Sequence, residues 1–294
     1  MKQQIPNAEE RLAAALNTVR PKLFRYCARM IGSAVDAEDV VQDVLLVAQE
    51  KLPDANVKNT EAWLMRIAHN KAIDHLRTRA RYRMVQFEDT DLPDTYQRPF
   101  DAQEAAKVAL SVFLQLTPLQ RACVILKDVL GYKLAEVAEM LGDQTVGSVK
   151  AALARGRQNL QRLATQTTEE QVIPLEPEAA ALLRLYAKRF QERDISGIQR
   201  MLLDDVRLDL VAVVRAQGKD RVGKYFGNYR ALDELSLTIG QVEGRPALYV
   251  EDGGEPFVVV LEFEVEHIAA IRDFHFARHS TDSMAFHALK EVPR

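Results

Sequence analysis

The chain has 294 residues but only two cysteines, Cys27 and Cys123, and neither belongs to a paired-cysteine motif. A disulfide framework and a cysteine-ligated metal site are therefore not expected, and two isolated thiols are typical of a reducing compartment. No apolar run is long enough to cross a bilayer, and residues 1–11 are polar. We therefore expect a soluble, cytoplasmic protein without a membrane partner.

Catalytic signatures are also scarce. The sequence contains no nucleophile beside a base, no constellation of metal ligands and no glycine-rich phosphate loop. An enzymatic activity, a cofactor and a bound metal are therefore not expected. The length, in contrast, is large for one compact core and predicts two or three domains.

Charge is unevenly distributed along the chain, although the net charge is only −3. Residues 63–83 hold six basic residues and one acidic residue, and residues 147–163 hold four basic residues and no acidic one. Residues 88–104, between them, are predominantly acidic. Two basic segments divided by an acidic one predict two separate phosphate contacts on a nucleic acid.

Apolar periodicity predicts only helices in the first half of the chain. They cover residues 12–31, a segment that begins near Asp36 as N-cap, and residues 61–83, 105–116, 119–130, 134–141 and 146–163. The last two flank a turn that begins at Gly142, which is helix-turn-helix spacing. The second half predicts helices and then successive strands, the last over residues 268–277, and so indicates an α+β domain.

Motifs in and before both basic segments carry a family resemblance. Residues 36–43 (Asp-Ala-Glu-Asp-Val-Val-Gln-Asp) and 62–77 resemble regions 2.2 to 2.4 of extracytoplasmic-function (ECF) sigma factors, and residues 116–121, 134–141 and 146–157 resemble their region 4. The two regions in tandem are far more specific than a single helix-turn-helix. The resemblance implies a promoter-recognition subunit of RNA polymerase, whose partners are core RNA polymerase and promoter DNA.

The resemblance also implies site residues. At the −10 promoter element, where a base is flipped out of the stack, it implies Asn56, Asn59, Arg66, Asn70, Lys71, Asp74, Arg77 and Arg81. At the −35 element it implies Ser148, Lys150, Ala151, Arg155 and Arg157. For core polymerase it implies Asp39, Gln42 and Asp43, a helix face that could otherwise simply be solvated. Because Ala151 and Ala152 offer no hydrogen bonds, we expect thin base readout there, and a basic residue at Ala152 should strengthen it.

The last third of the chain resembles the SnoaL-like members of the NTF2-like superfamily, which are cone-shaped α+β folds with an interior cavity. Strict alternation along residues 273–279 places Asp273, His275 and His279 on one strand face. A solvated sheet face is the simpler interpretation. If the face lines a cavity, Asp273 and His275 could contact a ligand, which the sequence does not identify, or act as acid and base.

The expected organisation is therefore two all-α sigma domains followed by an α+β NTF2-like domain. We assign sigma region 2 to residues 10–87, an acidic linker to 88–104, sigma region 4 to 105–165, a second linker to 166–177 and a regulatory SnoaL-like domain to 178–290. Because the second linker is short, we expect intramolecular docking of the last domain on the sigma domains.

Two other functions fit part of the sequence. One is a helix-turn-helix regulator that binds duplex DNA alone and carries a ligand-sensing or catalytic C-terminal domain, but it gives Asn70 and the arginine-rich helix no role. The other is an enzyme whose front half is a sensor or tether, for which no catalytic signature is present.

Overall fold

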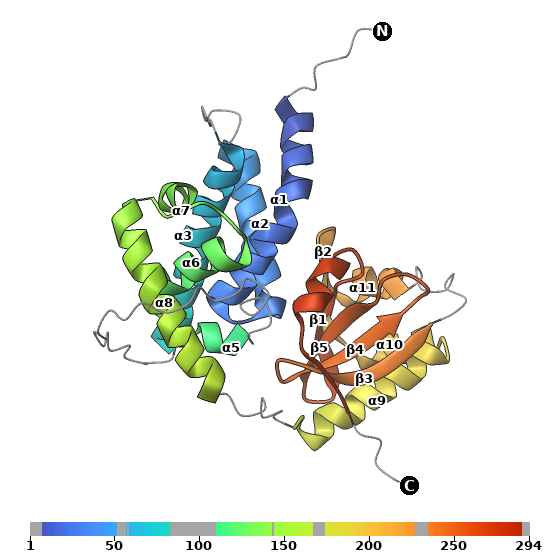
Figure 1. Cartoon of the computed structure of the whole chain (residues 1–294). Helices are drawn as coiled ribbons and strands as arrows, with labels where there is room; N and C mark the ends of the chain where they lie inside the picture. Colours follow the sequence, from blue (N-terminus) through green and yellow to red (C-terminus); the bar gives the residue numbers. More distant parts are fainter. Residues whose placement is uncertain are drawn as a thin grey trace. The chain divides into compact units, whose positions relative to one another are not determined.

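The structure is a computed structural model, and it describes residues 8–51, 57, 59–82, 110–142, 144–166, 174–226 and 235–289. The chain divides into two compact units, Met1–Glu169 and Glu170–Arg294 (Figure 1). The first unit is helical, and the second combines helices with one sheet. The expected change from all-α to α+β along the chain is therefore confirmed, while the acidic segment 88–104 lies outside the described residues.

Three long helices build the first half of the helical unit. They are α1 (Ala8–Ile31), α2 (Ala34–Lys51) and α3 (Thr60–Tyr82), and each contacts the other two. Their facing sides are apolar, with Leu23, Phe24, Val44 and Leu64 among the buried residues. Burial of such a side chain contributes roughly 1.5–3 kcal/mol, so this shared core fixes how the three helices pack.

Side-chain caps fix where two of these helices begin. The backbone N–H of Asp36 donates to Ser33 Oγ at 3.0 Å, and the N–H of Ala62 donates to Asn59 Oδ1 at 3.1 Å. Such caps satisfy backbone donors that have no partner within the helix. The expectation that Asp36 caps α2 is therefore wrong: Ser33 is the cap, and Asp36 lies in the first turn, where its charge favours the helix dipole.

The second half of the helical unit contains the expected helix-turn-helix. Its elements are α5 (Leu110–Phe113), α6 (Pro118–Val124), η2 (Ile125–Val129), α7 (Leu134–Met140) and α8 (Val146–Gln166). Thr117 caps α6, as its position before a proline predicts. Between α7 and α8, Gly142 adopts a φ of +80°, a conformation that a residue with a Cβ avoids. The π-helical turn η2 was not predicted.

The second unit is a seven-stranded sheet with the strand order β2-β1-β6-β5-β4-β3-β7. The strands are β1 (Leu202–Leu210), β2 (Val214–Gln217), β3 (Ser236–Val242), β4 (Arg245–Glu251), β5 (Phe257–Glu264), β6 (His267–Asp273) and β7 (Phe286–Ala288). Among the strands of the described residues, β1 and β6 pair in parallel and every other neighbouring pair is antiparallel.

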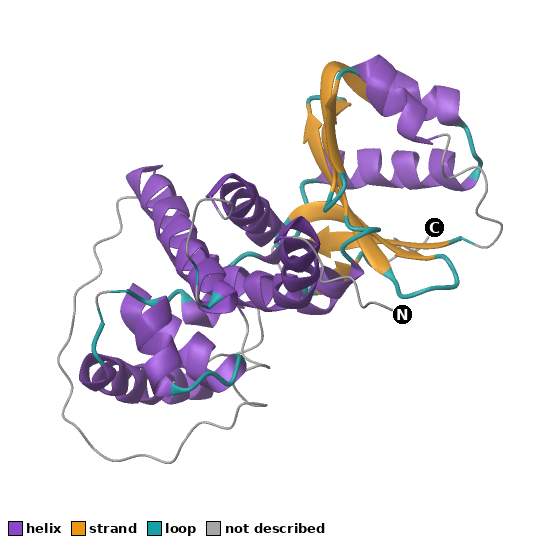
Figure 2. Cartoon of the chain, turned by 90° about the horizontal axis from the view of Figure 1, so that it is seen from above, coloured by secondary structure: helices purple, strands orange, loops and turns teal. Residues whose placement is uncertain are grey.

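Two helices of this unit, α9 (Pro177–Gln191) and α11 (Lys219–Tyr225), pack on the sheet, and a third, α10 (Ile195–Met201), packs on both of them (Figure 2). The layer between helices and sheet is the core of the unit, and it includes Leu183, Tyr186, Phe226, Val259 and Leu261. Any group on the core-facing side of the sheet is therefore shielded from water.

The strand predicted over residues 268–277 ends at Asp273. The chain then turns, so that Phe274 is fully buried while Phe276 is 58% exposed. Alternation therefore fails beyond Asp273, and the prediction that Asp273, His275 and His279 share one strand face is wrong. Among the described residues, no helix is long and apolar enough to cross a membrane.

Candidate nucleic-acid interface

One face of α3 is polar and exposed. Arg66, Asn70 and Asp74 follow one another at intervals of four residues, and Arg77 continues the row. Arg77 Nη1 lies 3.4 Å from Asp74 Oδ1, and the two side chains are 73% and 68% exposed. A pair this exposed contributes little stability, so both groups can exchange partners. The face has the chemistry of a helix that neutralises phosphates and presents an amide to base edges.

Other residues implied for the −10 element have different positions. Lys71 lies beside this face, with its Nζ 3.7 Å from Asp43 Oδ2 on α2. Asn59 caps α3, so it has a structural role whether or not it also contacts DNA. Asn56 and the side chain of Arg81 lie outside the described residues. The structure therefore brings four of the eight implied residues, Arg66, Asn70, Asp74 and Arg77, into one row.

If α3 contacts the −10 element, as the resemblance implies, replacing Arg77 by alanine should weaken promoter binding similarly for all promoter sequences, because a phosphate contact carries no base information. The slope of log affinity against log salt should fall by about 0.9, which corresponds to one phosphate. Filter binding over a salt series measures this slope. Arg200→Ala, which removes a 68%-exposed arginine of the second unit, is the control, and an unchanged slope in Arg77→Ala would exclude the phosphate contact.

Helix α8, the second helix of the helix-turn-helix, presents a second basic surface. Lys150, Ala151 and Arg155 are exposed, and Val149 and Leu160 are buried on the other side. Helix α8 is therefore amphipathic, with two cations on the free side, as entry into the major groove requires.

Ser148 belongs to the beginning of α8. Its backbone N–H donates to Thr145 Oγ1 at 3.1 Å, and its Oγ accepts from the Thr145 N–H at 3.0 Å. This reciprocal arrangement is that of a capping box. The side chain of Ser148 thus stabilises the N-terminal end of α8, and Lys150 and Arg155 come after it in the helix.

Two expectations for α8 are wrong. Ala152 is 1% exposed, so a basic residue there would be buried against the helix-turn-helix core instead of restoring base readout. Arg157 binds the buried Asp128 with both ends of its guanidinium, at 2.9 Å from Nε and 2.6 Å from Nη2. This hydrogen bonding raises the pKa of Arg157. Arg157 therefore holds α8 against η2, and we no longer assign it to the −35 element.

The acidic face of α2 lies on the outside of the helical unit. Asp43 is exposed, Asp39 and Gln42 are half-buried beside it, and Leu46 follows with 57% of its surface exposed. Glu38, in contrast, is 1% exposed and forms an ion pair with Arg20. The three residues implied for core polymerase therefore lie together on one face. The neighbouring Glu38 instead forms its ion pair in the interior of the helical unit.

A second group of polar residues lies in the C-terminal unit. Asp273 is paired with Val259 across β6 and β5, so its side chain lies on the same, core-facing side of the sheet. Its carboxyl group is fully buried and accepts hydrogen bonds from the hydroxyl of Tyr225 and, at 2.7 Å, from the backbone N–H of His275. Burial raises the pKa of Asp273 to about 7. The interpretation of this position as a solvated face is therefore wrong.

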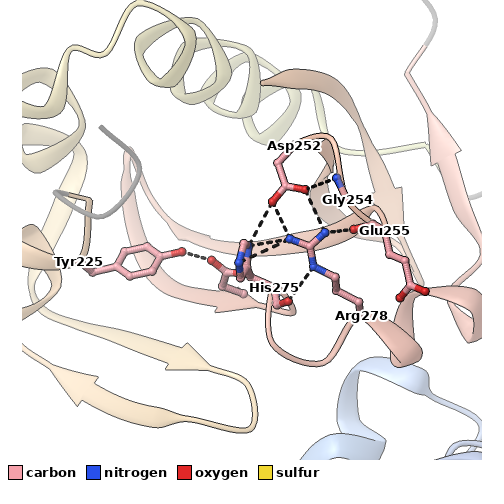
Figure 3. Close-up of polar contacts among 7 residues, drawn as sticks. Tyr225, Asp252, Gly254, Glu255, His275 and Arg278 are labelled. Atoms are coloured by element: carbon pink, nitrogen blue, oxygen red, sulfur yellow. Dashed lines mark hydrogen bonds and ion pairs between the residues drawn. The ribbon is translucent and has the colours of Figure 1, made fainter. Parts of the chain in front are cut away.

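The His275 ring belongs to a different contact network (Figure 3). Arg278 binds Asp252 with both Nη atoms, at 2.9 and 2.5 Å, and its Nη2 lies 3.3 Å from His275 Nδ1. Arg278 also packs over the ring of Phe257, 5.0 Å from its centroid. Burial and the neighbouring guanidinium lower the pKa of His275. Asp273 and His275 therefore do not form the side-chain pair expected of an acid and a base, and the Asp252–Arg278 pair joins the β4–β5 turn to the segment after β6.

Two residues with a structural role, Arg121 and Tyr132, are not indicated by the sequence patterns. Arg121 is 2% exposed, and its Nη2 donates to the carbonyls of Leu114 and Leu116 at 3.0 and 2.9 Å. An arginine directly before the apolar run 122–126 is the available signal, because a cation that is buried with this run must find partners within the fold. For Tyr132, no local pattern indicated the hydrogen bond to Glu61, 71 residues away.

Comparison with known proteins identifies the helical unit. Residues 16–82 match the model of sigma-70 region 2, and residues 109–160 match that of sigma-70 region 4. The ECF RNA polymerase sigma factor SigG of Mycobacterium tuberculosis is 34% identical over 221 residues, which cover 65% of this chain and 60% of SigG. The ECF RNA polymerase sigma factor SigD of Mycobacterium bovis is 32% identical over 161 residues, which cover 51% of this chain and 74% of SigD.

Solved structures are similar to both units. The structure of the ECF sigma factor SigJ of Mycobacterium tuberculosis aligns with 89% of this chain over 95% of its own length. The two sequences are 22% identical, and the TM-score is 0.36. An NTF2-like protein of unknown function from Burkholderia pseudomallei covers 33% of this chain, with 90% of its own length, 18% identity and a TM-score of 0.29. The second unit combines helices with a strongly bent sheet (Figure 2), which is the α+β arrangement that the sequence pattern predicted.

The exposed basic helix faces lie within the two segments that match the sigma-70 models. Two regions with exposed basic helix faces stand in the order in which the family has them, and the match to SigD spans three quarters of that relative. The chain is a member of the extracytoplasmic-function sigma factor family and carries a C-terminal α+β unit.

Proposed function

We propose that this protein directs core RNA polymerase to promoters and starts transcription there, in the cytoplasm. In this proposal α3 contacts and melts the −10 element, α8 enters the major groove of the −35 element, and the α2 face with Asp39, Gln42 and Asp43 binds core polymerase. The observation that carries the proposal is the pair of exposed basic surfaces on two matched sigma regions of one chain.

The proposal is tested against the rival that the chain is a conventional helix-turn-helix regulator. Promoter DNA and an unrelated duplex are titrated with the chain alone, with core polymerase alone and with both together. We expect sequence-specific retention only with both, since the chain's basic surfaces need core polymerase to hold them at the promoter. Specific binding by the chain alone would favour the regulator, and no dependence on the chain would exclude both functions.

Contacts at the −35 element should depend on two side chains. Lys150→Ala and Arg155→Ala together should remove most selection of the upstream sequence, with a loss of about 1–3 kcal/mol for each contact that reads a base. Selection of bound promoters from a randomised −35 library measures this. Lys133→Ala, which removes an exposed lysine before α7, is the control. An unchanged upstream preference in the double variant would assign readout to another face.

We further propose that the residues after the 166–177 linker form a regulatory domain instead of a catalytic one. Within the described residues no group of three or more potential ligands could hold a metal ion. The carboxyl group of Asp273 faces the interior beside Tyr225, so Asp273 is the residue that a ligand of this domain would contact. The ring of His275 instead contacts Arg278. Domain boundaries at 10–87, 105–165 and 178–290 accompany this proposal.

Truncation after Gln166 should change the amount of transcript without changing which promoter is used. The reason is effective concentration: a linker of about a dozen residues holds the domain beside the sigma regions, where even a weak docking contact competes with assembly. Multiple-round transcription on several promoters measures both quantities. Equal transcript levels with and without the domain would leave it without a regulatory role.

A further inference from the structure

The turn before α8 and the first turns of the helix form the part of region 4 that approaches bases most closely. In a helix-turn-helix, residues near the N-terminal end of the second helix contact base edges in the major groove. In this chain these are residues 144–151, all of which the structure describes. The side chains of this segment therefore decide which groups of a base the protein can contact.

The polar side chains of this segment belong to the capping box of α8. Thr145 Oγ1 accepts from the backbone N–H of Ser148 at 3.1 Å, and Ser148 Oγ accepts from the N–H of Thr145 at 3.0 Å. Ser148 Oγ also lies 2.9 Å from Oε1 of Gln144. Base contacts by Thr145 and Ser148 would therefore compete with the cap, and Gln144 directs its amide oxygen toward it.

The other exposed side chains at the very start of the helix are apolar. Val146, the first residue of α8, is 41% exposed, Gly147 has no side chain, and Ala151 is exposed. Val149 and Ala152 are buried on the opposite side. A single exposed valine is common on protein surfaces. Val146, however, lies at the helix end that enters the major groove, in a segment that matches sigma-70 region 4.

One base carries a group that suits these apolar side chains. Of the four DNA bases, thymine presents a methyl group in the major groove, and apolar side chains contact it. Val146 and Ala151 can bury such a methyl group but cannot form a hydrogen bond with a base. They are five positions apart, which is about 7.5 Å along the helix axis or about two base-pair steps of B-DNA. Their contacts therefore fall within one short element.

Two cations accompany the apolar side chains. Lys150 directly precedes Ala151, Arg155 follows it by one helical turn, and both cations are exposed. Phosphate contacts of this kind fix the register and orientation of a helix on the duplex. Methyl contact needs this close approach, because apolar contacts extend only to about 4.5 Å. Methyl contacts therefore add to those of Lys150 and Arg155 and are lost with them.

We propose that Val146 and Ala151 read thymine methyl groups in the −35 element, so that the protein selects A·T base pairs at two positions there. The inference rests on the proposed function, because it specifies what α8 recognises at that element. It also adds a residue to the contact, since the family resemblance implies Ala151 there but not Val146. Sequence selection at these two positions then needs no hydrogen bond to a base.

Replacement of thymine by uracil tests the inference, because uracil keeps all hydrogen-bonding groups of thymine and lacks only the methyl group. Sequences that bind in the presence of core polymerase are first selected from promoters with a randomised −35 element. Each thymine of a selected element, on either strand, is then replaced singly by uracil, and filter binding measures the affinity. We expect a loss of about fourfold at each of two positions, which corresponds to about 0.8 kcal/mol for one buried methyl group.

Protein variants assign each methyl group to a side chain. Val146→Ala should weaken the effect of uracil at one position, and Ala151→Gly should weaken it at the other. The ratio of affinities for thymine and uracil is taken within each variant, so effects on helix stability cancel, and circular dichroism shows whether each variant is folded. Val213→Ala, which shortens a 57%-exposed valine of the second unit, is the matched control and should keep both uracil effects.

Three results would overturn the inference. They are selected −35 elements without recurring A·T pairs, unchanged binding after every replacement by uracil, and uracil effects that are equal in Val146→Ala, Ala151→Gly and the parent protein. Failure of the proposed function gives a different result, namely specific binding by the chain without core polymerase. The same uracil series on the sequences that the chain then selects would still decide the methyl contacts. Absence of sequence-specific binding under both conditions would refute both proposals.

Discussion

Replacing Arg157 by alanine is expected to lower the free energy of unfolding of the helical unit by about 3–5 kcal/mol. The substitution leaves the Asp128 carboxylate, whose side chain is 4% exposed, without its charged partner, and an unpaired buried charge is costly. Urea unfolding followed by the fluorescence of Trp63 measures the effect. Trp63 is the only tryptophan of the chain, so its signal comes from the helical unit alone.

Two further variants isolate the cause. Lys150→Ala removes an exposed cation from the same side of α8 and should shift stability by less than about 0.5 kcal/mol. Arg157→Met combined with Asp128→Leu removes both charges and should recover much of the loss, because no buried charge is then left unpaired. If Arg157→Ala unfolds like the parent protein but loses −35 recognition, then Arg157 reads DNA and the structural assignment is wrong.

Replacing Asp273 by asparagine should stabilise the C-terminal unit near pH 7.5 and remove most of its pH dependence between about pH 4 and 7. Burial raises the pKa of Asp273 to about 7, from an ordinary value of about 3.9. The folded state therefore keeps a proton that the unfolded state has released, and stability falls as pH rises through this window. Asparagine stays neutral and can still pair with Tyr225, so the gain could reach about 4 kcal/mol.

Hydrogen exchange of peptides from β5 and β6, corrected for the intrinsic rate at each pH, follows this unit separately. Asp252→Asn should act in the opposite direction, because the hydrogen bonds from Arg278 lower the pKa of Asp252 and its charge stabilises the fold near neutral pH. A parent protein whose β6 protection does not fall between pH 4 and 7 would show that Asp273 is ionised in the fold at little cost.

The helical half could be predicted from sequence because its signals are local. Apolar residues recur at helical spacing, Thr117-Pro118 marks the start of a helix, and Gly142 marks the turn of the helix-turn-helix. The exposed faces with Asn70 and Lys150 follow directly from the same periodicity. Local patterns were therefore sufficient to predict the helices whose one face is exposed to solvent along its whole length.

Predictions failed where the deciding contact is distant in sequence. Arg157 lies two helical turns after Lys150 and so shares its face by periodicity, but its long side chain reaches Asp128, 29 residues earlier. The polar spacing after Asp273 looks like a continued strand, but the chain turns because Phe274 packs into the core. Neither the partner of Arg157 nor the packing of Phe274 is encoded in a window of neighbouring residues.

Run-off transcription with purified core polymerase tests the central claim most directly. Core polymerase is supplied with nucleotides and a library of promoter fragments from one genome that encodes this chain, with and without the protein. The account predicts transcripts of defined start sites that appear only when the protein is present, and that are lost when Lys150 and Arg155 are both replaced by alanine. Transcription that is identical with and without the protein would contradict the account.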